Sequence, residues 1–185
     1  MDDKEIVRMF FDRNEDSLTE AGNKYKTYLT YIANNILHDR QDSEECLNDA
    51  LLAVWNSIPP QNPEDLRTYL GKLTRDTAID RLKTKTRKKR IRSDLVKSLD
   101  EIEEIFSGGD LGSEIEAEEL SREISRFLYS IDEVKRDVFV QRYWYCDSIE
   151  TICARYGFKK SRVYVMLKRT RDALADHLKK EGFIV

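Results

Sequence analysis

Hydrophobic residues in the first half of the chain recur every three or four positions, the spacing that places them on one face of an α-helix. The pattern predicts a helix over residues 25–36 and a second over residues 47–58, joined by a short polar turn around residues 38–42. Asp42 and Glu45 make a plausible capping pair for the second helix. The stripes that these two helices are expected to bury are Tyr25, Tyr28, Leu29, Ile32, Ala33 and Ile36, and Leu47, Ala50, Leu51, Val54, Trp55 and Ile58.

A third helix is expected from about Pro63 to Lys89. Asn62 is a favourable N-cap and proline is favoured at the first helical position, so the sequence marks a helix start there. The loop before it, residues 58–62, contains two prolines and suggests no chemistry of its own. The apolar residues of the third helix are Leu66, Tyr69, Leu70, Leu73, Ile79 and Leu82.

The segment from Asp147 to Leu174 predicts two helices that meet at a tight turn at Gly157. Asp147 and Glu150 form a candidate capping pair for the first of them, whereas the expected N-cap of the second, Lys159, is a poor cap. This layout is typical of a helix-turn-helix, whose second helix enters the DNA major groove. The first helix is expected to bury Ile149, Ile152, Cys153 and Tyr156, and the second Val163, Met166 or Leu167, Thr170 and Leu174.

Composition adds that the fold is all-α and that the charge is segregated. Of the 185 residues, 40% are hydrophobic and 36% are charged, which favours small helical domains with much exposed surface. Nine Lys/Arg and two Asp lie between Arg75 and Arg92, and eight bases and two acids lie between Lys159 and Lys180. Ten acids and one lysine lie between Asp94 and Glu119. The net charge of −3 therefore hides two basic modules suited to nucleic acid.

The remaining features predict a reduced, cytoplasmic protein without a metal or cofactor. Cys46, Cys146 and Cys153 contain no CxxC pair, and a buried, reduced role is expected for them. The first residues are acidic and their apolar run is too short for a signal peptide or a membrane span.

Taken together, these stretches resemble a bacterial RNA polymerase sigma factor of the sigma-70 family, extracytoplasmic-function (group 4) type. DSEECLNDALLAVWNSI is similar to the polymerase-binding helix of region 2, and LRTYLGKLTRDTAIDRLKTKTRKK to the helix that melts and reads the −10 element. RDVFVQRYWYCDSIETICARYGFKKSRVYVMLKRTRDAL is similar to region 4. The resemblance implies two small helical domains, region 2-like over residues 1–92 and region 4-like over 118–185, joined by an acidic flexible linker over 93–117.

The resemblance also implies a function and a set of site residues. Such a factor binds core RNA polymerase, through the β′ clamp helices and the β flap, and directs it to promoter DNA without catalysing a reaction. An anti-sigma factor is a possible further partner, and no small-molecule substrate or membrane insertion is expected. The implied polymerase-binding residues are Asp42, Glu45, Asn48, Asp49, Leu52 and Trp55, of which Trp55 is expected to be mainly core. The implied −10 residues are Asn62, Arg67, Lys72, Arg75, Asp76, Arg81 and Lys83, and the implied −35 residues are Lys160, Ser161, Arg162, Tyr164, Val165, Lys168 and Arg169.

Some positions depart from the family pattern. Lys159 replaces the usual cap, Ser130-Ile131 stands where the family has Leu-Pro, and the loop at residues 58–62 has no aromatic residue. The start of the following helix and the identity of any captured base therefore stay open.

The acidic linker admits more than one role. It is a flexible spacer, it threads the polymerase channel as the linkers of the family are thought to, or it folds back on the basic modules. In the last case Leu99, Ile102, Ile105 and Phe106 have a short helical spacing that suits docking.

Two other functions compete with the sigma factor. A stand-alone helix-turn-helix regulator would bind DNA tightly without polymerase. An enzyme acting on nucleic acid would need a carboxylate cluster for metal or a nucleophile with a base, and neither histidine pairs with the carboxylates at a telling spacing.

Overall fold

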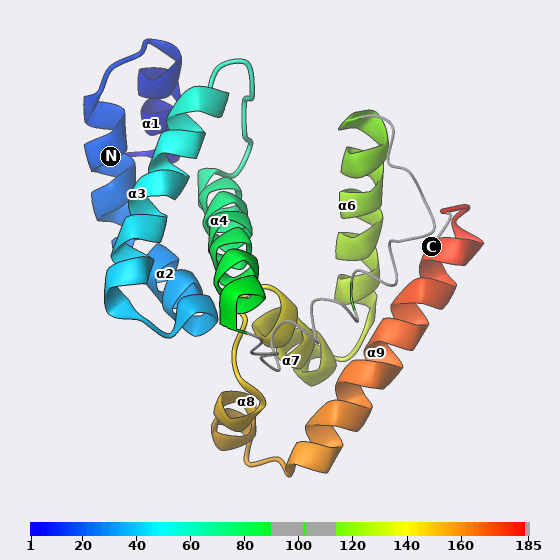
Figure 1. The fold of residues 1–185 in the computed structure, drawn as a ribbon. Helices are drawn as coiled ribbons and strands as arrows, with labels where there is room; N and C mark the ends of the chain where they lie inside the picture. Colours follow the sequence, from blue (N-terminus) through cyan, green and yellow to red (C-terminus); the bar gives the residue numbers. More distant parts are fainter. Residues whose placement is uncertain (90–101, 103–113, 184–185) are drawn as a thin grey trace. The chain divides into compact units, whose positions relative to one another are not determined.

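The computed structural model describes residues 1–89, 102 and 114–183, and its regular elements within this part of the chain are all α-helices (Figure 1). The chain divides into two compact units, Met1–Ile91 and Arg92–Val185. The all-α prediction is therefore confirmed. Among the described residues, none of the helices combines the length and the apolar character needed to span a bilayer.

The N-terminal unit is a four-helix arrangement in which α2 lies in contact with the three other helices. Its core contains Phe10, Leu29, Val54, Ile58 and Leu70, which the structure buries completely. The apolar stripes read from the sequence thus face one another across α2, α3 and α4. The helices are α1 (Asp3–Phe11), α2 (Asp16–Leu37), α3 (Arg40–Ser57) and α4 (Leu66–Lys89).

Helix α1 is an element that the sequence reasoning missed. A capping box starts it: the Asp2 side chain accepts from the first-turn backbone, and the Glu5 Oε2 accepts from the Asp2 backbone N–H at 3.1 Å. Ile6, Val7 and Phe10 then face the core. A capping pair followed by apolar residues at helical spacing was the signal that would have identified it.

The starts of α3 and α4 correct two predicted caps. Asp39, not Asp42, caps α3: its backbone is extended and its Oδ1 accepts from the Asp42 N–H at 2.9 Å. Helix α4 begins at Leu66 and not at Pro63, and the Asp65 Oδ1 accepts from the Thr68 N–H at 2.7 Å. In both places the sequence offers several cap residues, and only the backbone conformation selects one of them.

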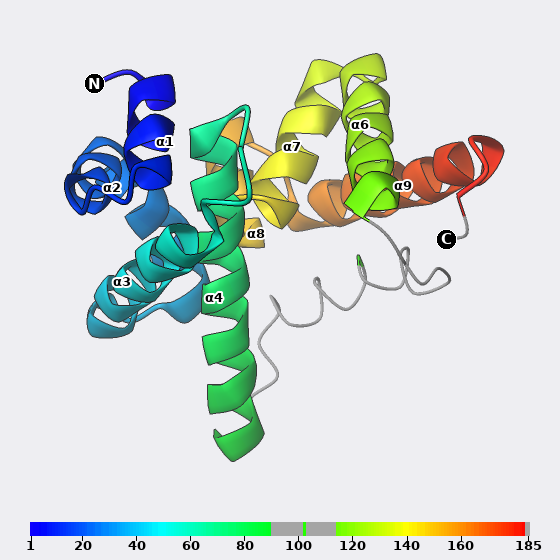
Figure 2. The same ribbon diagram turned by 90° about the horizontal axis from the view of Figure 1, so that it is seen from above.

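In the described part of the C-terminal unit, α6, α7 and α8 pack against the long helix α9. Helix α9 contacts α6, α7 and α8, and Figure 2 shows α6 and α7 side by side. Val138, Ile152, Val163, Leu174 and Leu178 form the centre of its core. The helices are α6 (Glu114–Ser130), α7 (Glu133–Tyr143), α8 (Ile149–Tyr156) and α9 (Lys160–Lys180).

Two features of this unit bear on the predicted boundaries. Helix α6 begins at Glu114, inside the stretch 93–117 that was assigned to the linker. Helix α7 begins at Glu133 after Asp132, whose Oδ1 accepts from the Lys135 N–H at 3.2 Å. This cap defines the helix start that the Ser130-Ile131 departure had left open. The rest of the predicted linker lies outside the described residues, except for Ile102.

Candidate nucleic-acid interface

Helices α8 and α9 form the predicted helix-turn-helix. Gly157 ends α8 with φ of +67°, the left-handed conformation that glycine adopts without a steric penalty. The cap of α8 is Ser148, whose Oγ accepts from the Thr151 N–H at 3.1 Å, and not Asp147 as predicted. Asp147 is buried instead, with its Oδ2 3.1 Å from Arg155 Nη1 and its backbone oxygen accepting from Arg142 Nη1 at 2.8 Å. Asp147 therefore stabilises the approach to the turn from inside the core.

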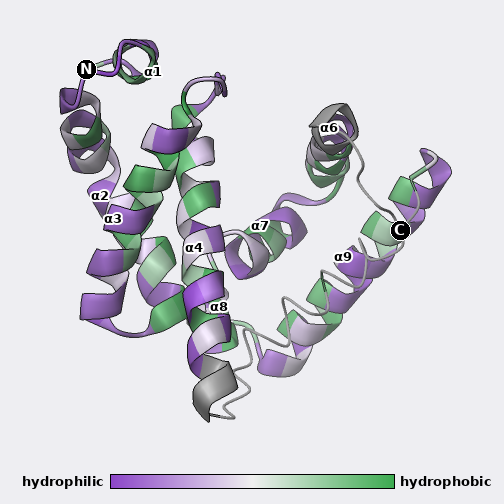
Figure 3. Ribbon diagram, turned by 45° about the horizontal axis from the view of Figure 1, so that its top comes forward, coloured by the Kyte–Doolittle hydropathy of each residue, from purple (hydrophilic) through white to green (hydrophobic). Residues whose placement is uncertain are grey.

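Helix α9 presents two distinct faces. Its buried residues include Val163, Leu167, Thr170 and Leu174. Of the two residues that the sequence left open, Leu167 is therefore the buried one and Met166 is not fully buried. Hydrophobic and hydrophilic residues alternate along its turns (Figure 3). Every side chain predicted for the −35 set is exposed: Lys160, Ser161, Arg162, Tyr164, Val165, Lys168 and Arg169.

The cations on α9 have weak protein partners. Lys160 pairs with Glu150 of α8, which raises the pKa of Lys160 and lowers that of Glu150. The Lys168 Nζ lies 2.8 Å from Asp172 Oδ2, one turn along the same helix. The Arg162 guanidinium stacks over Phe158, 3.8 Å from the ring centroid. Exposed pairs of this kind are screened by water and contribute little to stability, so a phosphate can replace the carboxylate.

The start of α9 lacks a side-chain cap, as the sequence predicted. Lys159 occupies the N-cap position with an extended backbone and makes no side-chain hydrogen bond to the first turn. The backbone N–H groups of a helix N-terminus and a nearby lysine together favour an anion.

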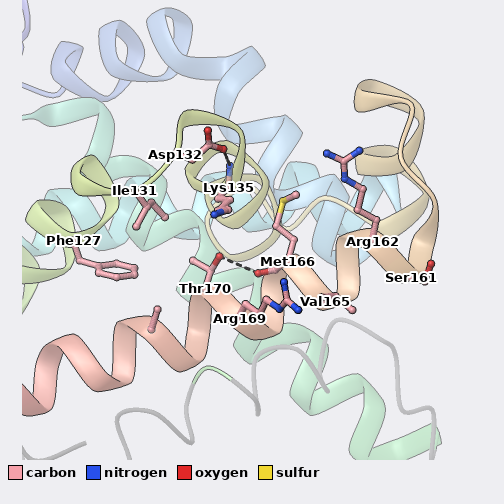
Figure 4. A pocket seen from close by; sticks show the side chains of 11 residues that line it. Phe127, Ile131, Asp132, Lys135, Ser161, Arg162, Val165, Met166, Arg169 and Thr170 are labelled. Atoms are coloured by element: carbon pink, nitrogen blue, oxygen red, sulfur yellow. Dashed lines mark hydrogen bonds between the residues drawn. The ribbon is translucent and has the colours of Figure 1, made fainter.

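A groove runs along one side of the exposed face of α9. Its volume is about 580 Å³, and its lining comes from α9 and from the corner between α6 and α7. Figure 4 shows Phe127, Ile131 and Met166 directed into the hollow. Lys135, Arg162 and Arg169 add positive charge to the same lining. Sequence reasoning identified the two arginines but not the groove, because the α6–α7 corner is remote from them in the chain.

Helix α4 divides the predicted −10 residues between two faces. Leu70, Thr74 and Ala78 are buried at four-residue intervals, and Arg81 continues this row toward α3. The Arg81 guanidinium pairs there with Asp49 and with Glu45, the latter at 3.2 Å. Four other predicted −10 residues of α4 lie away from the row formed by Leu70, Thr74, Ala78 and Arg81. They are exposed or half-buried: Lys72, Arg75, Asp76 and Lys83.

Three of the predicted −10 residues have distinct surroundings. Partial burial raises the pKa of Asp76, and the positive charges of Arg75 and Lys72 offset only part of that effect. The Arg67 guanidinium stacks on the Tyr28 ring, 4.7 Å from its centroid. Asn62 is exposed in the loop between α3 and α4.

Helix α3 places the predicted polymerase-binding residues on an outer face. Leu52 is 55% exposed, and Asn48 is exposed as well. Trp55 is half-buried near Phe10, where it packs against the core, and Arg13 lies over its ring at 5.2 Å. The acidic members of the set are the carboxylates that pair with α4: Asp42 with Lys85, and Glu45 and Asp49 with Arg81. Lys85 is a contact that sequence reasoning missed.

A histidine–carboxylate pair in the C-terminal unit was also missed. His177 Nε2 lies 2.9 Å from Glu123 Oε1, although the two residues are 54 positions apart, and Arg126 Nη1 lies 2.5 Å from Glu123 Oε2. Glu181 brings a further carboxylate to within 4.8 Å of the pair. Both oxygens of Glu123 thus have protein partners, which accounts for the burial of its carboxylate.

The cysteines are free thiols, with Cys46 and Cys146 buried and Cys153 half-buried. Burial raises the pKa of the Cys46 thiol to about 11. This thiol is therefore protonated and unreactive near neutral pH, as the sequence led us to expect.

Comparison with known proteins gives one family match. Residues 23–88, which span most of α2, all of α3 and nearly all of α4, match the model of sigma-70 region 2. No curated protein matches the chain significantly. A solved structure described as "CnrH in complex with the cytosolic domain of CnrY" aligns over 98% of this chain and 99% of its own, with 15% identity and a TM-score of 0.44. At that TM-score the alignment does not by itself establish a shared fold. The region 2 match covers the helices that carry the α3 and α4 faces described above.

Proposed function

We propose that this protein is a transcription initiation factor of the extracytoplasmic-function type, which binds core RNA polymerase and directs it to promoters with −10 and −35 elements. The observation that carries the proposal is the region 2 match over residues 23–88. The helix-turn-helix with seven exposed recognition positions on α9 supports it independently. The factor acts in the cytoplasm, where the polymerase is, and needs no cofactor or reaction of its own.

The outer face of α3 is the proposed polymerase-binding surface. Leu52 supplies exposed apolar area, and Asn48 and Asp49 surround it with polar groups. An apolar anchor with a polar rim is typical of a specific protein interface. The β′ clamp helices are the proposed partner of this face, and the β flap is the proposed partner of the C-terminal unit.

The outer face of α4 and the loop before it are the proposed −10 site. Lys72, Arg75 and Lys83 offer phosphate contacts, and Asn62 offers an amide to a base at the loop. Extruding a base costs a few kcal/mol, which contacts to unpaired DNA offset. Arg81 has a different role in this scheme, because its guanidinium is held by α3.

Helix α9 is the proposed −35 reader. Arg162, Lys168 and Arg169 supply cations for phosphates and base edges, and Tyr164 and Val165 supply apolar contacts. Each unit alone offers a small interface and should bind weakly. Attachment of both to polymerase makes the second contact intramolecular and so raises the overall affinity.

The test is co-purification with core polymerase followed by run-off transcription from promoter templates. The full chain should co-elute with core polymerase, and Leu52→Ala should weaken this association, whereas the exposed α2 variant Lys26→Ala should not. Arg162→Ala and Lys168→Ala should reduce transcripts only from templates with an intact upstream element. Lys179→Ala, at the far end of α9, is the matched control. A chain that neither co-elutes with polymerase nor supports transcripts would overturn the proposal.

The stand-alone regulator is the second candidate, because the C-terminal unit has a complete helix-turn-helix. It predicts tight, sequence-specific binding of duplex DNA by the isolated chain. Weak binding alone and specific binding with core polymerase would exclude it. An inhibitory anti-sigma partner is a further expectation of the family, and a pull-down with the full chain would detect it.

A further inference from the structure

Arg162 is held in a different way from the neighbouring cation Lys160. Its guanidinium lies over the face of the Phe158 ring, 3.8 Å from the ring centroid, whereas Lys160 pairs with the carboxylate of Glu150. A carboxylate occupies the donors of the cation that it binds. A ring face fixes the plane of a guanidinium and uses none of its five N–H donors, which point outward from the edge of the group. Stacking therefore orients Arg162 and leaves its hydrogen-bonding edge available.

Phe158 lies in the turn between α8 and α9, and both its backbone and its ring are fixed. Its backbone N–H donates to the Cys153 carbonyl oxygen at 3.1 Å. Its ring packs against the core cluster of the C-terminal unit and stacks on the Tyr156 ring, with the centroids 5.5 Å and the planes 23° apart. The Tyr156 Oη accepts in turn from Gln141 Nε2 of α7 at 2.8 Å. A continuous line of contacts thus runs from α7 through two aromatic rings to the guanidinium.

The place of Arg162 on α9 determines what this oriented guanidinium can reach. Arg162 is exposed in the first turn of the helix, which begins at Lys160. The N-terminal residues of a recognition helix are the ones that contact base edges in the major groove. Guanine presents its O6 and N7 acceptors side by side there, and they match the planar fork of an arginine. A phosphate can be bound by a mobile point charge such as lysine, so a fixed plane favours the base edge.

We propose that Phe158 positions the Arg162 guanidinium for a bidentate contact with a guanine, and that this pair sets the base preference of α9 at one position of the upstream element. Phe158 acts through Arg162 and touches no base itself. This role of Phe158 rests on the proposed function, in which α9 reads the −35 element. It adds a positioning residue outside the exposed face of α9 and names the base that the helix reads.

The two residues should contribute unequally to the base preference. A bidentate arginine–guanine contact discriminates against the other bases by roughly five- to 150-fold. Holding a guanidinium over a partly exposed ring is a smaller effect, about two- to fivefold. Arg162→Ala should therefore erase the preference for guanine, and Phe158→Leu should lower it about two- to fivefold. Phe158→Leu leaves the charge unchanged, so the salt dependence of binding should not change.

The experiment selects sequences from a library of duplexes with a randomised upstream element, using the full chain together with core polymerase. The preference is the enrichment of each base at each position. The variants are Phe158→Leu, Arg162→Ala, their combination, and Arg162→Lys. The matched control is Phe183→Leu, which makes the same change in another phenylalanine that packs against the same cluster, beyond the far end of α9. Urea unfolding of each variant separates a change in base preference from a loss of fold.

Positioning predicts a loss at one base position. Phe158→Leu should lower the guanine preference only where Arg162→Ala erases it, and should have no further effect in the combined variant. Phe183→Leu should leave every base preference unchanged. Arg162→Lys keeps the charge and leaves the core untouched, so it tests the fork even if Phe158→Leu does not fold. It should lose the guanine preference with the salt dependence unchanged.

The proposal is overturned if Phe158→Leu weakens binding to all sequences equally, because that pattern belongs to a residue that only supports the fold. A uniform loss in Arg162→Ala, with the salt slope lowered by about one, would show a phosphate contact and would also overturn it. So would an Arg162→Lys variant that keeps the full preference. An unmodified chain that enriches no sequence would refute the proposed function itself, whereas enrichment that Phe158→Leu leaves unaltered refutes only the role of Phe158.

Discussion

Replacing Lys159 by serine should stabilise the C-terminal unit and lower its affinity for DNA. A serine at an N-cap accepts a hydrogen bond from the first turn and contributes about 1 kcal/mol. Removing a cation from the positive end of the helix dipole adds about 0.3–1 kcal/mol. The backbone of Lys159 is already extended, at φ −75° and ψ 147°, so serine requires no rearrangement. The expected gain is therefore about 1–2 kcal/mol in the free energy of unfolding.

The assay is urea unfolding of the full chain, with hydrogen exchange to assign the change to α8 and α9. Lys159→Ala is the control, because it removes the charge and adds no hydrogen-bond acceptor. Serine should exceed alanine by about 1 kcal/mol in stability. The two variants should bind duplex DNA equally weakly, with a salt slope reduced by about one relative to the unmodified chain. Equal stability of the serine and alanine variants would refute the view that α9 lacks only a cap.

Three further predictions test the N-terminal unit. Burial raises the pKa of the Cys46 thiol from 9.0 to about 11. The contribution of the protonated thiol to the free energy of unfolding is therefore intact below pH 9 and is lost as the pH rises toward 11. Between pH 8 and pH 10.5, urea unfolding should show a larger loss of stability for the unmodified chain than for Cys46→Ala. A Cβ at Gly71 would lie 2.3 Å from the Tyr28 Oη, so Gly71→Ala should destabilise the chain by about 1–3 kcal/mol, and adding Tyr28→Phe should recover part of that loss. Arg81 is held by the carboxylates of α3, so Arg81→Ala should weaken binding of the polymerase complex to −10 DNA less than Lys72→Ala does. Fluorescence anisotropy measures both affinities. An equal loss of affinity would mean that Arg81 leaves α3 to bind DNA.

Most of the helical framework was readable from local pattern. The stripes of α2, α3 and α9 predicted which side chains are buried, because a helix places residues three and four positions apart on one face whatever it packs against. The turn at Gly157 and the missing cap at Lys159 were also predicted correctly, because each depends on the type of a single residue. Helix α1 was predictable in the same way, because its capping box is a local feature of the sequence.

Sequence alone thus determined the all-α class, the two basic modules and the exposed face of α9, all of which depend on spacing and charge along the chain. The tertiary structure decided which partner each polar group has. It turned Arg81 away from the other cations of α4 and toward Asp49, buried Asp147 beside Arg155, and joined Glu123 to His177. It also formed the groove from the α6–α7 corner and α9. These contacts join residues that are separated along the chain, and their energies depend on distance and burial in the folded unit, which no local pattern encodes.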